Sequence, residues 1–251
     1  MFPRKIKVCD AFGIPVYLDF SLIILLLMFA TGGGSFTAGI ACAIVLAVSI
    51  VAHELGHALT ARAFGYSTQD ITISLLGGCA SLIALPRKAH QELLTALAGP
   101  LVSFALSGLG FLACATLPIS SYYLAFALGC LAWMNLTLGG FNLLPGFPMD
   151  GGRIFRSVLC AFLSRPRATL VAMWVGRVFA ILLALSGLHA LMTGGGWGFI
   201  RLLIAWMIWR EGYREYIVAR MESAWRYDDY RARVSPPPYG GEGEDCDVTR
   251  N

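Results

Sequence analysis

The sequence predicts an all-α polytopic membrane protein of about six transmembrane helices, with a small re-entrant β-hairpin after the second helix. Three observations support this fold class. Hydrophobic residues make up 57% of the 251 residues and charged residues only 14%, a balance that a water-exposed surface of this size would not carry. Apolar runs long enough to cross a bilayer recur along the chain. Lys and Arg are concentrated in alternate loops between those runs.

The first apolar run, 16–30, follows three basic residues, as both a signal peptide and a first transmembrane helix would. Asp19 interrupts the run and no convincing A-x-A cleavage site follows it, which favours a retained helix. Gly65 is expected to end the second helix. The remaining predicted spans are 36–64, 93–117, 122–142, 170–192 and 197–209.

Between Tyr66 and Arg87 the pattern changes to segments that are too short and too mixed for another span. Apolar and polar side chains alternate over 71–74, Gly77 and Gly78 interrupt the alternation, and small and apolar residues follow. We expect a hairpin or a re-entrant strand here. At membrane depth such backbone has to be covered by protein or line a wet cavity.

The fourth span is expected to end at a run of helix breakers. The glycine pair at 139–140 and the prolines at 145 and 148 cannot continue a regular helix, so an unwound segment should result. This segment carries Asn142 and Asp150, and a short basic amphipathic helix is predicted after it.

The chain divides into a transmembrane domain, 1–212, and a charged tail, 213–251, whose composition predicts disorder from about residue 234. The turns at 31–35, 118–121 and 193–196 contain no Lys or Arg, whereas the opposite loops contain nearly all of them. With six spans, this distribution places both termini and the tail in the cytoplasm.

The most informative stretch is His53-Glu54-Leu55-Gly56-His57, inside the second span. Histidines at i and i+4 lie on one face of a helix, so their imidazoles can bind one metal ion. In zinc hydrolases of this pattern the glutamate takes a proton from the water that the metal activates. A charge near the centre of an apolar helix costs about 2.5–3.5 kcal/mol and marks function. The alternative is a chance match, with the three side chains satisfied by neighbouring helices.

Composition disfavours two other kinds of site. A net charge of +4 is too small to indicate nucleic-acid binding. The seven cysteines include no CxxC pair and most lie in apolar stretches, so neither a disulfide framework nor a cysteine metal site is indicated. His90 and His189 are expected to be interfacial or packed histidines and not metal ligands.

The HExxH motif in a membrane helix, followed at 142–153 by NLLPGFPMDGGR, resembles the site-2 protease family of intramembrane zinc metalloproteases. The resemblance covers most of the chain and implies one zinc ion, bound by His53, His57 and a third protein ligand, Asp150. It also implies that Glu54 is the catalytic base. Asn142, which matches the family's asparagine, would position the substrate or stabilise the oxyanion.

Asp150 has an alternative interpretation, because Asp is a favoured N-cap and a helix is expected from Gly151. Beside the HExxH motif the ligand role is favoured, since no Cys or nearby His supplies a third ligand. Ser103 departs from the asparagine that many relatives of this type carry, a change expected to affect local packing and not zinc chemistry. No PDZ insert or appended regulatory domain is expected, and the layout is nearest to the sporulation-factor branch.

The implied function is regulated intramembrane proteolysis by a multi-pass protein of the bacterial cell (inner) membrane. The partners would be a transmembrane protein or peptide substrate and the lipid bilayer, with a homo-oligomer left open. An unwound substrate would add as an extra strand to the segment 71–76. The alternative is a metal-ion transporter or metal-binding membrane module that uses the same ligands. Such a site needs no Glu54 and would require more polar residues in the first, fifth and sixth spans. We interpret these spans as nearly free of polar residues. The intact Glu54 also disfavours an inactive adaptor.

Overall fold

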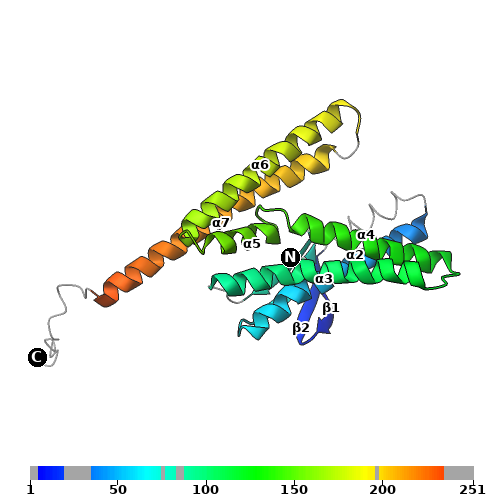
Figure 1. The fold of residues 1–251 in the computed structure, drawn as a ribbon, viewed down its shortest axis with the longest axis horizontal. Helices are drawn as coiled ribbons and strands as arrows, with labels where there is room; N and C mark the ends of the chain where they lie inside the picture. Colours follow the sequence, from blue (N-terminus) through cyan, green and yellow to red (C-terminus); the bar gives the residue numbers. More distant parts are fainter. Residues whose placement is uncertain (1–4, 20–34, 75–76, 83–87, 196–197, 235–251) are drawn as a thin grey trace, which may run out of the picture.

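The computed structural model describes residues 5–19, 35–74, 77–82, 88–195 and 198–234, which form a four-stranded sheet and six helices (Figure 1). The elements in chain order are β1 (Lys5–Ala11), β2 (Ile14–Asp19), α2 (Phe36–Ala63), β3 (Thr68–Ser74), β4 (Gly77–Leu82), α3 (Ala89–Thr116), α4 (Tyr122–Asn142), α5 (Asp150–Leu159), α6 (Arg165–Met192) and α7 (Gly198–Val234).

Within the described residues, four helices are long and apolar enough to cross a membrane: α2, α3, α4 and α6. The shortest has 21 residues, about 31 Å of helix, which matches a bilayer core of about 30 Å. Predicted spans two to five are therefore confirmed. The sixth, 197–209, falls mainly in α7, which is not one of the four, and most of the first lies outside the described residues. The count of six spans is not confirmed.

The start of the first predicted span is a strand, so the prediction of a helix from Val16 is wrong. Residues up to Asp19 belong to β2, which pairs antiparallel with β1 through a turn at Phe12 and Gly13. Both turn residues have positive φ, 53° and 80°, the combination that matches the twist of a two-residue hairpin. Ile14 and Val16 point to the same side and are buried, so the alternation of a half-buried strand prevails here.

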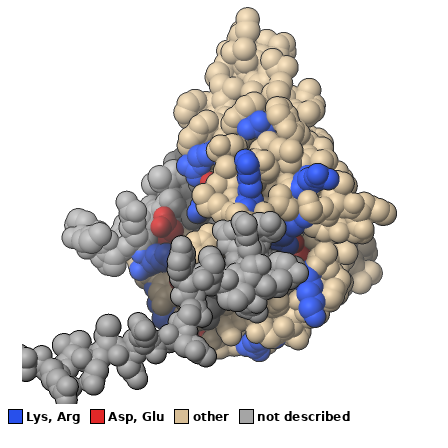
Figure 2. Space-filling model, turned by 90° about the vertical axis from the view of Figure 1, so that its left-hand side faces the viewer, with Lys and Arg blue, Asp and Glu red and all other residues tan. Residues whose placement is uncertain are grey.

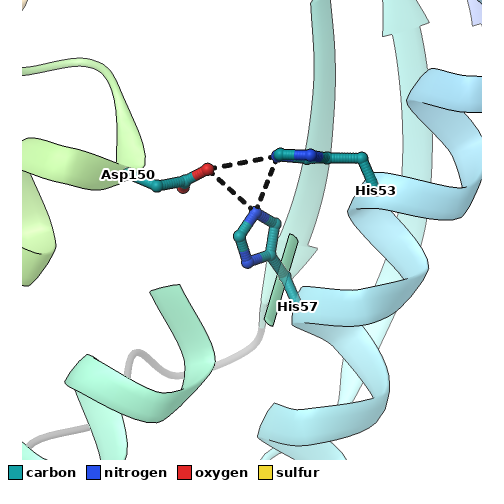
Figure 3. Close-up of side chains that lie close together, drawn as sticks. All are labelled: His53, His57 and Asp150. Carbon is teal, nitrogen blue, oxygen red and sulfur yellow. Dashed lines mark hydrogen bonds and ion pairs between the residues drawn. The ribbon is translucent and has the colours of Figure 1, made fainter. Parts of the chain in front are cut away.

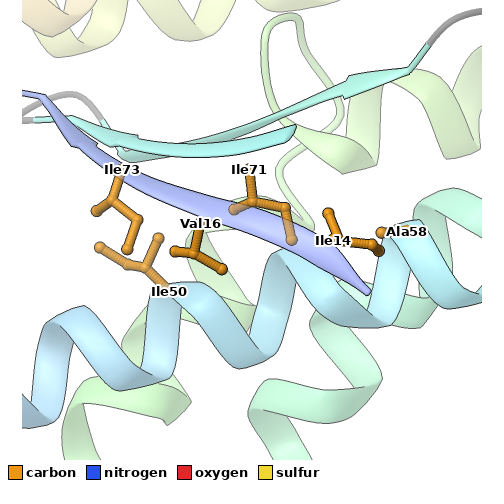
Figure 4. Packing of buried hydrophobic residues seen from close by; sticks show 6 residues of the cluster. All are labelled: Ile14, Val16, Ile50, Ala58, Ile71 and Ile73. Carbon is orange, nitrogen blue, oxygen red and sulfur yellow. The ribbon is translucent and has the colours of Figure 1, made fainter. Parts of the chain in front are cut away.

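The predicted hairpin at 66–87 is confirmed as β3 and β4, which pair antiparallel. In addition, β2 pairs in parallel with β3, a long-range contact that was not predicted, and this gives a single sheet in the order β1-β2-β3-β4. One face of this sheet packs on α2, and Figure 4 shows the apolar side chains between them. These buried residues are Ile14, Val16, Ile50, Ala58, Ile71 and Ile73.

The position of β3 inside the sheet corrects the expectation that a substrate adds to this segment as an extra strand. Because β3 has a neighbour on each side, its backbone N–H and C=O groups are already used in pairing. The described part of the segment 71–76, residues 71–74, therefore cannot accept a substrate as an extra strand. The edges of the sheet are β1 and β4.

The two glycine sites near helix ends behave differently. Gly65 follows the C-terminus of α2 with φ of 85°, so the predicted helix stop is confirmed. The glycine pair at 139–140, however, does not end α4, which continues to Asn142. A β-carbon at Gly139 would lie 3.3 Å from Cβ of Ser103 in α3, so this glycine permits close packing of α3 and α4.

Helices α6 and α7 form an antiparallel pair that leans away from α2, α3 and α4, with α5 between the two groups (Figure 1). α7 has 37 residues and runs without a break across positions 212–213, where the boundary of the charged tail was predicted. The predicted disorder from residue 234 falls almost entirely outside the described residues.

Candidate metal centre

His53, His57 and Asp150 converge on one point between α2 and the first residue of α5 (Figure 3). Oδ2 of Asp150 lies 3.1 Å from Nε2 of His53 and 3.2 Å from Nε2 of His57. The two Nε2 atoms are 3.2 Å apart. Among the described residues, this is the group of His, Cys, Asp and Glu side chains whose geometry could hold a metal ion.

The triangle of donor atoms fits zinc. Zinc bonds of about 2.0–2.1 Å in a tetrahedral site place neighbouring ligand atoms roughly 3.3 Å apart. The separations of 3.1–3.2 Å are close to this value. Two imidazole nitrogens and one carboxylate oxygen are a common donor set for a catalytic zinc, and they leave the fourth position open.

Hydrogen bonds to α3 fix which nitrogen of each histidine faces the centre. Nδ1 of His57 lies 2.7 Å from the backbone carbonyl of Thr95, which can only accept, so this nitrogen carries the proton. Nδ1 of His53 lies 2.9 Å from Oγ of Ser103, which can accept in the same way. Both Nε2 atoms then present a lone pair to the metal position, the arrangement expected of metal-binding histidines.

The contact with Ser103 corrects the expectation that this residue affects packing and not zinc chemistry. Ser103 is fully buried and touches a proposed ligand directly through its hydroxyl group. A sequence gives no signal for such a contact, because Ser103 lies on a different helix, 50 positions from His53.

Gly99 of α3 lies directly against the two histidine rings. A β-carbon at this position would lie 2.7 Å from Nε2 of His53, and closer still to Nε2 of His57. The two helices also approach each other at Gly56, where a β-carbon would lie 2.8 Å from the carbonyl oxygen of Ala98. Only glycine therefore leaves room for the donor atoms and for a metal between them.

Asp150 does not cap α5, so the capping alternative is wrong. The N-cap residue is Met149, and Asp150 is the first residue of the helix, with its carboxylate directed to the two histidines. Its carboxylate oxygen therefore faces the same point as the two imidazole nitrogens, where it can bind the same cation.

A buried ion cluster holds the helix that carries Asp150. Arg156 of α5 is 3% exposed, and its Nε donates to Oε1 of Glu92 in α3 at 3.0 Å. Its Nη1 donates to Glu215 of α7 at 2.9 Å, and Arg165 of α6 donates to Glu92 at 2.8 Å. The guanidinium also lies over the ring of Phe147, 4.8 Å from its centroid, in the loop that precedes Asp150. The cluster thus joins four helices next to the metal centre.

The positive charge of Arg156 shifts the pKa of Glu215, so the contribution of this ion pair to folding stability depends on pH. Burial raises the pKa of Glu215, but the positive charge of Arg156 lowers it more, so the net shift is downward. A carboxyl group whose folded pKa is depressed stabilises the fold above its unfolded pKa, near 4.3, and this stabilisation is lost as the pH falls.

Two predicted site residues lie outside the three-residue group. Glu54 is half-buried on α2, between the two histidines in sequence. Asn142 is the last residue of α4, and its Nδ2 donates to the carbonyl of Leu138 at 3.0 Å. His90 and His189 are exposed and also lie outside this group.

We expect Gly99→Ala to abolish zinc binding, because the added methyl group would occupy the space between the histidine nitrogens. The matched control is Gly108→Ala on the same helix, where a β-carbon meets nothing within 4 Å. Metal analysis of the purified proteins checks the prediction. Equal zinc contents in the two variants would contradict this account of Gly99.

We expect Ser103→Ala to weaken zinc binding by about 10–100-fold, the usual effect of removing a partner that orients a metal-binding histidine. Ser107→Ala is the control, because Ser107 is buried on the same helix one turn further along. Zinc affinity is measured by competition with a chelator, and thermal unfolding tests whether both variants fold. The prediction fails if the two serine variants release zinc at the same chelator concentration.

Comparison with known proteins agrees with this geometry. Residues 41–122 and 118–186 match the description "Peptidase family M50". The chain is 32% identical over 240 residues to zinc metalloprotease MJ0392 of Methanocaldococcus jannaschii, an alignment that covers 93% of this chain and 67% of that protein. It is 34% identical over 226 residues to putative zinc metalloprotease sll0528 of Synechocystis, covering 82% of this chain and 58% of the relative. It is 37% identical over 177 residues to putative zinc metalloprotease Rip3 of Mycobacterium tuberculosis, covering 69% of this chain and 45% of the relative.

A solved structure is also similar. The site-2 protease from Methanocaldococcus jannaschii superposes with a TM-score of 0.63 at 31% sequence identity, covering 84% of this chain and 95% of the solved chain. The predicted family, the metalloprotease class and the zinc cofactor are confirmed by these comparisons and by the geometry of the three side chains. The chain is a multi-pass membrane protein that belongs to peptidase family M50, the site-2 protease family of zinc metalloproteases.

Proposed function

We propose that this protein is an intramembrane zinc metalloendopeptidase, which hydrolyses a peptide bond in or near a transmembrane helix of its substrate. The observation that carries the proposal is the group of His53, His57 and Asp150, placed on helices packed among four candidate membrane spans. A zinc ion held by these three side chains supplies Lewis acidity, which activates water for attack on a carbonyl group.

Each protein group has a separate role in this proposal. The two histidines and Asp150 bind the metal, and α3 orients the histidine rings through Thr95 and Ser103. Glu54 is the general base that takes a proton from the attacking water and later delivers it to the leaving amine. Its position on α2 between the two histidines in sequence supports this role.

Asn142 would position the substrate or stabilise the oxyanion. It ends α4 immediately before the loop that leads to Asp150, which supports a place near the scissile bond. Its side-chain amide now donates to Leu138, so it would have to exchange this hydrogen bond for one to the substrate.

A metal transporter is less well supported. The relatives that match this chain are named as zinc metalloproteases, and a transit site has no need of a glutamate between two histidine ligands. The same named relatives favour an active enzyme over an inactive adaptor.

A substrate helix must unwind before it can be cleaved, because its backbone groups are hydrogen-bonded within the helix. The freed N–H and C=O groups then need new partners, which the edge of a sheet can supply. Since β3 is an inner strand, the edge that serves this purpose is β4, which also packs along α2. We propose that the unwound substrate segment pairs with β4 (Gly77–Leu82).

The distribution of Lys and Arg supports a cytoplasmic location for one end of the molecule and for the metal centre. Figure 2 shows Lys and Arg side chains gathered on this end, which includes the N-terminus of α3 and the charged part of α7. Positively charged segments are retained in the cytoplasm. We propose that both termini are cytoplasmic, in a bacterial cell membrane, and that cleavage releases a fragment to that side.

We expect Glu54→Gln to reduce cleavage by at least about 100-fold, the lower range for loss of a general base, while zinc content stays unchanged. Cleavage is followed by co-expression with candidate single-pass membrane proteins and detection of a shorter product. Asp150→Ala should lose both zinc and activity, and Glu222→Gln, an exposed carboxylate on α7, should lose neither. Full activity of Glu54→Gln would remove Glu54 from the mechanism.

Proline scanning of β4 tests the proposed substrate edge. Neighbouring residues of a strand direct their N–H groups to opposite sides, so either Cys79→Pro or Ala80→Pro removes an outward N–H without breaking the pairing with β3. We expect that variant to retain zinc and thermal stability but to cleave slowly. Val8→Pro in β1, at the other edge, is the control and should cleave normally. If both folded β4 variants cleave at the wild-type rate, substrate pairing with β4 is wrong.

A further inference from the structure

Arg177 lies near the middle of α6, one of the candidate membrane spans. Our interpretation of residues 170–192 as nearly bare of polar groups overlooked it. Apolar neighbours on this helix, such as Val178, are exposed on the surface that would face lipid. Within the described part of the chain, the Nε atom of Arg177 is buried and has no hydrogen-bond partner, and no carboxylate forms an ion pair with the guanidinium. A guanidinium whose charge no carboxylate balances is costly wherever it is withdrawn from water.

Two tryptophan rings hold the guanidinium group in place. Its central carbon lies 4.7 Å from the ring centroid of Trp174, one turn earlier on α6, and 4.5 Å from that of Trp209 on α7. Contacts with aromatic faces use the planar face of a guanidinium and leave its N–H donors free at the edge. Both rings are partly exposed, Trp174 at 55% and Trp209 at 43%, so the site opens on the outer surface of the helix pair.

The packing of α7 on α6 sets the depth of this site. Gly212 faces Met173, since a β-carbon on the glycine would lie 3.4 Å from Cγ of Met173. In this antiparallel register Arg177 is level with Trp209, immediately before Arg210, where α7 changes from apolar to charged. Arg210 in turn lies over the ring of Trp206, at 5.0 Å. Tryptophan and arginine together at such a boundary are typical of the lipid headgroup region. Figure 2 shows basic side chains on the face of the molecule toward which the charged part of α7 extends.

An acceptor supplied by the membrane would fit these observations on Arg177. An arginine presents a planar fork of N–H donors, which matches two oxygens of a phosphate group. Exposure to water alone would satisfy these donors, but it would not require two rings that fix the guanidinium in one orientation. A net negative charge on the ligand would also balance the charge that no protein carboxylate balances.

We propose that Arg177, Trp174 and Trp209 form a binding site for the phosphate group of an anionic phospholipid, in the leaflet next to the charged part of α7. The site is separate from the metal centre and does not depend on the proposed protease activity. A bound headgroup would hold α6 and α7 at a fixed depth in the bilayer.

Native mass spectrometry tests the proposal on the full chain, reconstituted in nanodiscs with equal amounts of phosphatidylglycerol and phosphatidylcholine. The wild type should retain phosphatidylglycerol in preference to phosphatidylcholine. Arg177→Gln should retain about fivefold less phosphatidylglycerol, the effect of one basic residue at an anionic surface. Trp174→Leu keeps the charge but removes one ring, and it should reduce retention as well.

Arg201→Gln is the matched control, because Arg201 is an arginine on α7 that reaches the carbonyl of Ser186 and lies over no tryptophan ring in the described structure. This variant should retain phosphatidylglycerol as the wild type does. Thermal unfolding confirms that each variant is folded, and the higher Tm of the wild type in phosphatidylglycerol should be absent from Arg177→Gln. Equal retention of the two lipids by the wild type, or unchanged phosphatidylglycerol on Arg177→Gln, would overturn the proposal. Displacement of the lipid by inorganic phosphate would likewise overturn it, since the site would then recognise a free anion.

Discussion

The close contact between α2 and α3 is the constraint on which the metal centre depends. The HExxH pattern places two imidazoles on one face of α2, but it does not fix their rotation or their protonation. α3 fixes both, because Thr95 and Ser103 accept hydrogen bonds from the far side of each ring. This approach is possible because Gly99 has no side chain at the point where the rings meet the helix. The ligand geometry is therefore a property of a helix pair and not of a motif alone.

The third donor comes from the other half of the protein and needs its own support. Asp150 begins a short helix of ten residues, too short to be stable by itself. Arg156 anchors this helix through carboxylates of α3 and α7, and it also covers Phe147 in the preceding loop. A buried charge cluster is costly to form, but removal of one member would leave the others uncompensated. It thus specifies one position for α5, and with it the position of the Asp150 carboxylate.

The sheet and the α6–α7 pair place the metal centre between two different kinds of surface. On one side, the sheet packs on α2, and its edge strand β4 is the proposed pairing site for an extended peptide. On the other side, α6 and α7 carry exposed apolar residues and an arginine between two tryptophan rings, which are suited to contact lipid. The proposed function requires both surfaces, since an intramembrane protease would hold an unwound substrate while it remains anchored in the bilayer.

The sequence by itself determined the membrane class, spans two to five, the β3–β4 hairpin and the identity of the three side chains that converge. Most of these follow from local pattern: apolar runs of bilayer length, alternation over a few residues, and the i, i+4 spacing of His53 and His57. Asp150 is the exception, since its role was implied by the resemblance to the site-2 protease family. Tertiary structure alone decided that Val16 begins no helix, that β3 is an inner strand, that Ser103 and Gly99 contact the histidines, and that Arg156 is paired. Each of these depends on contacts between segments far apart in the chain, and such contacts leave no periodic signal in the sequence.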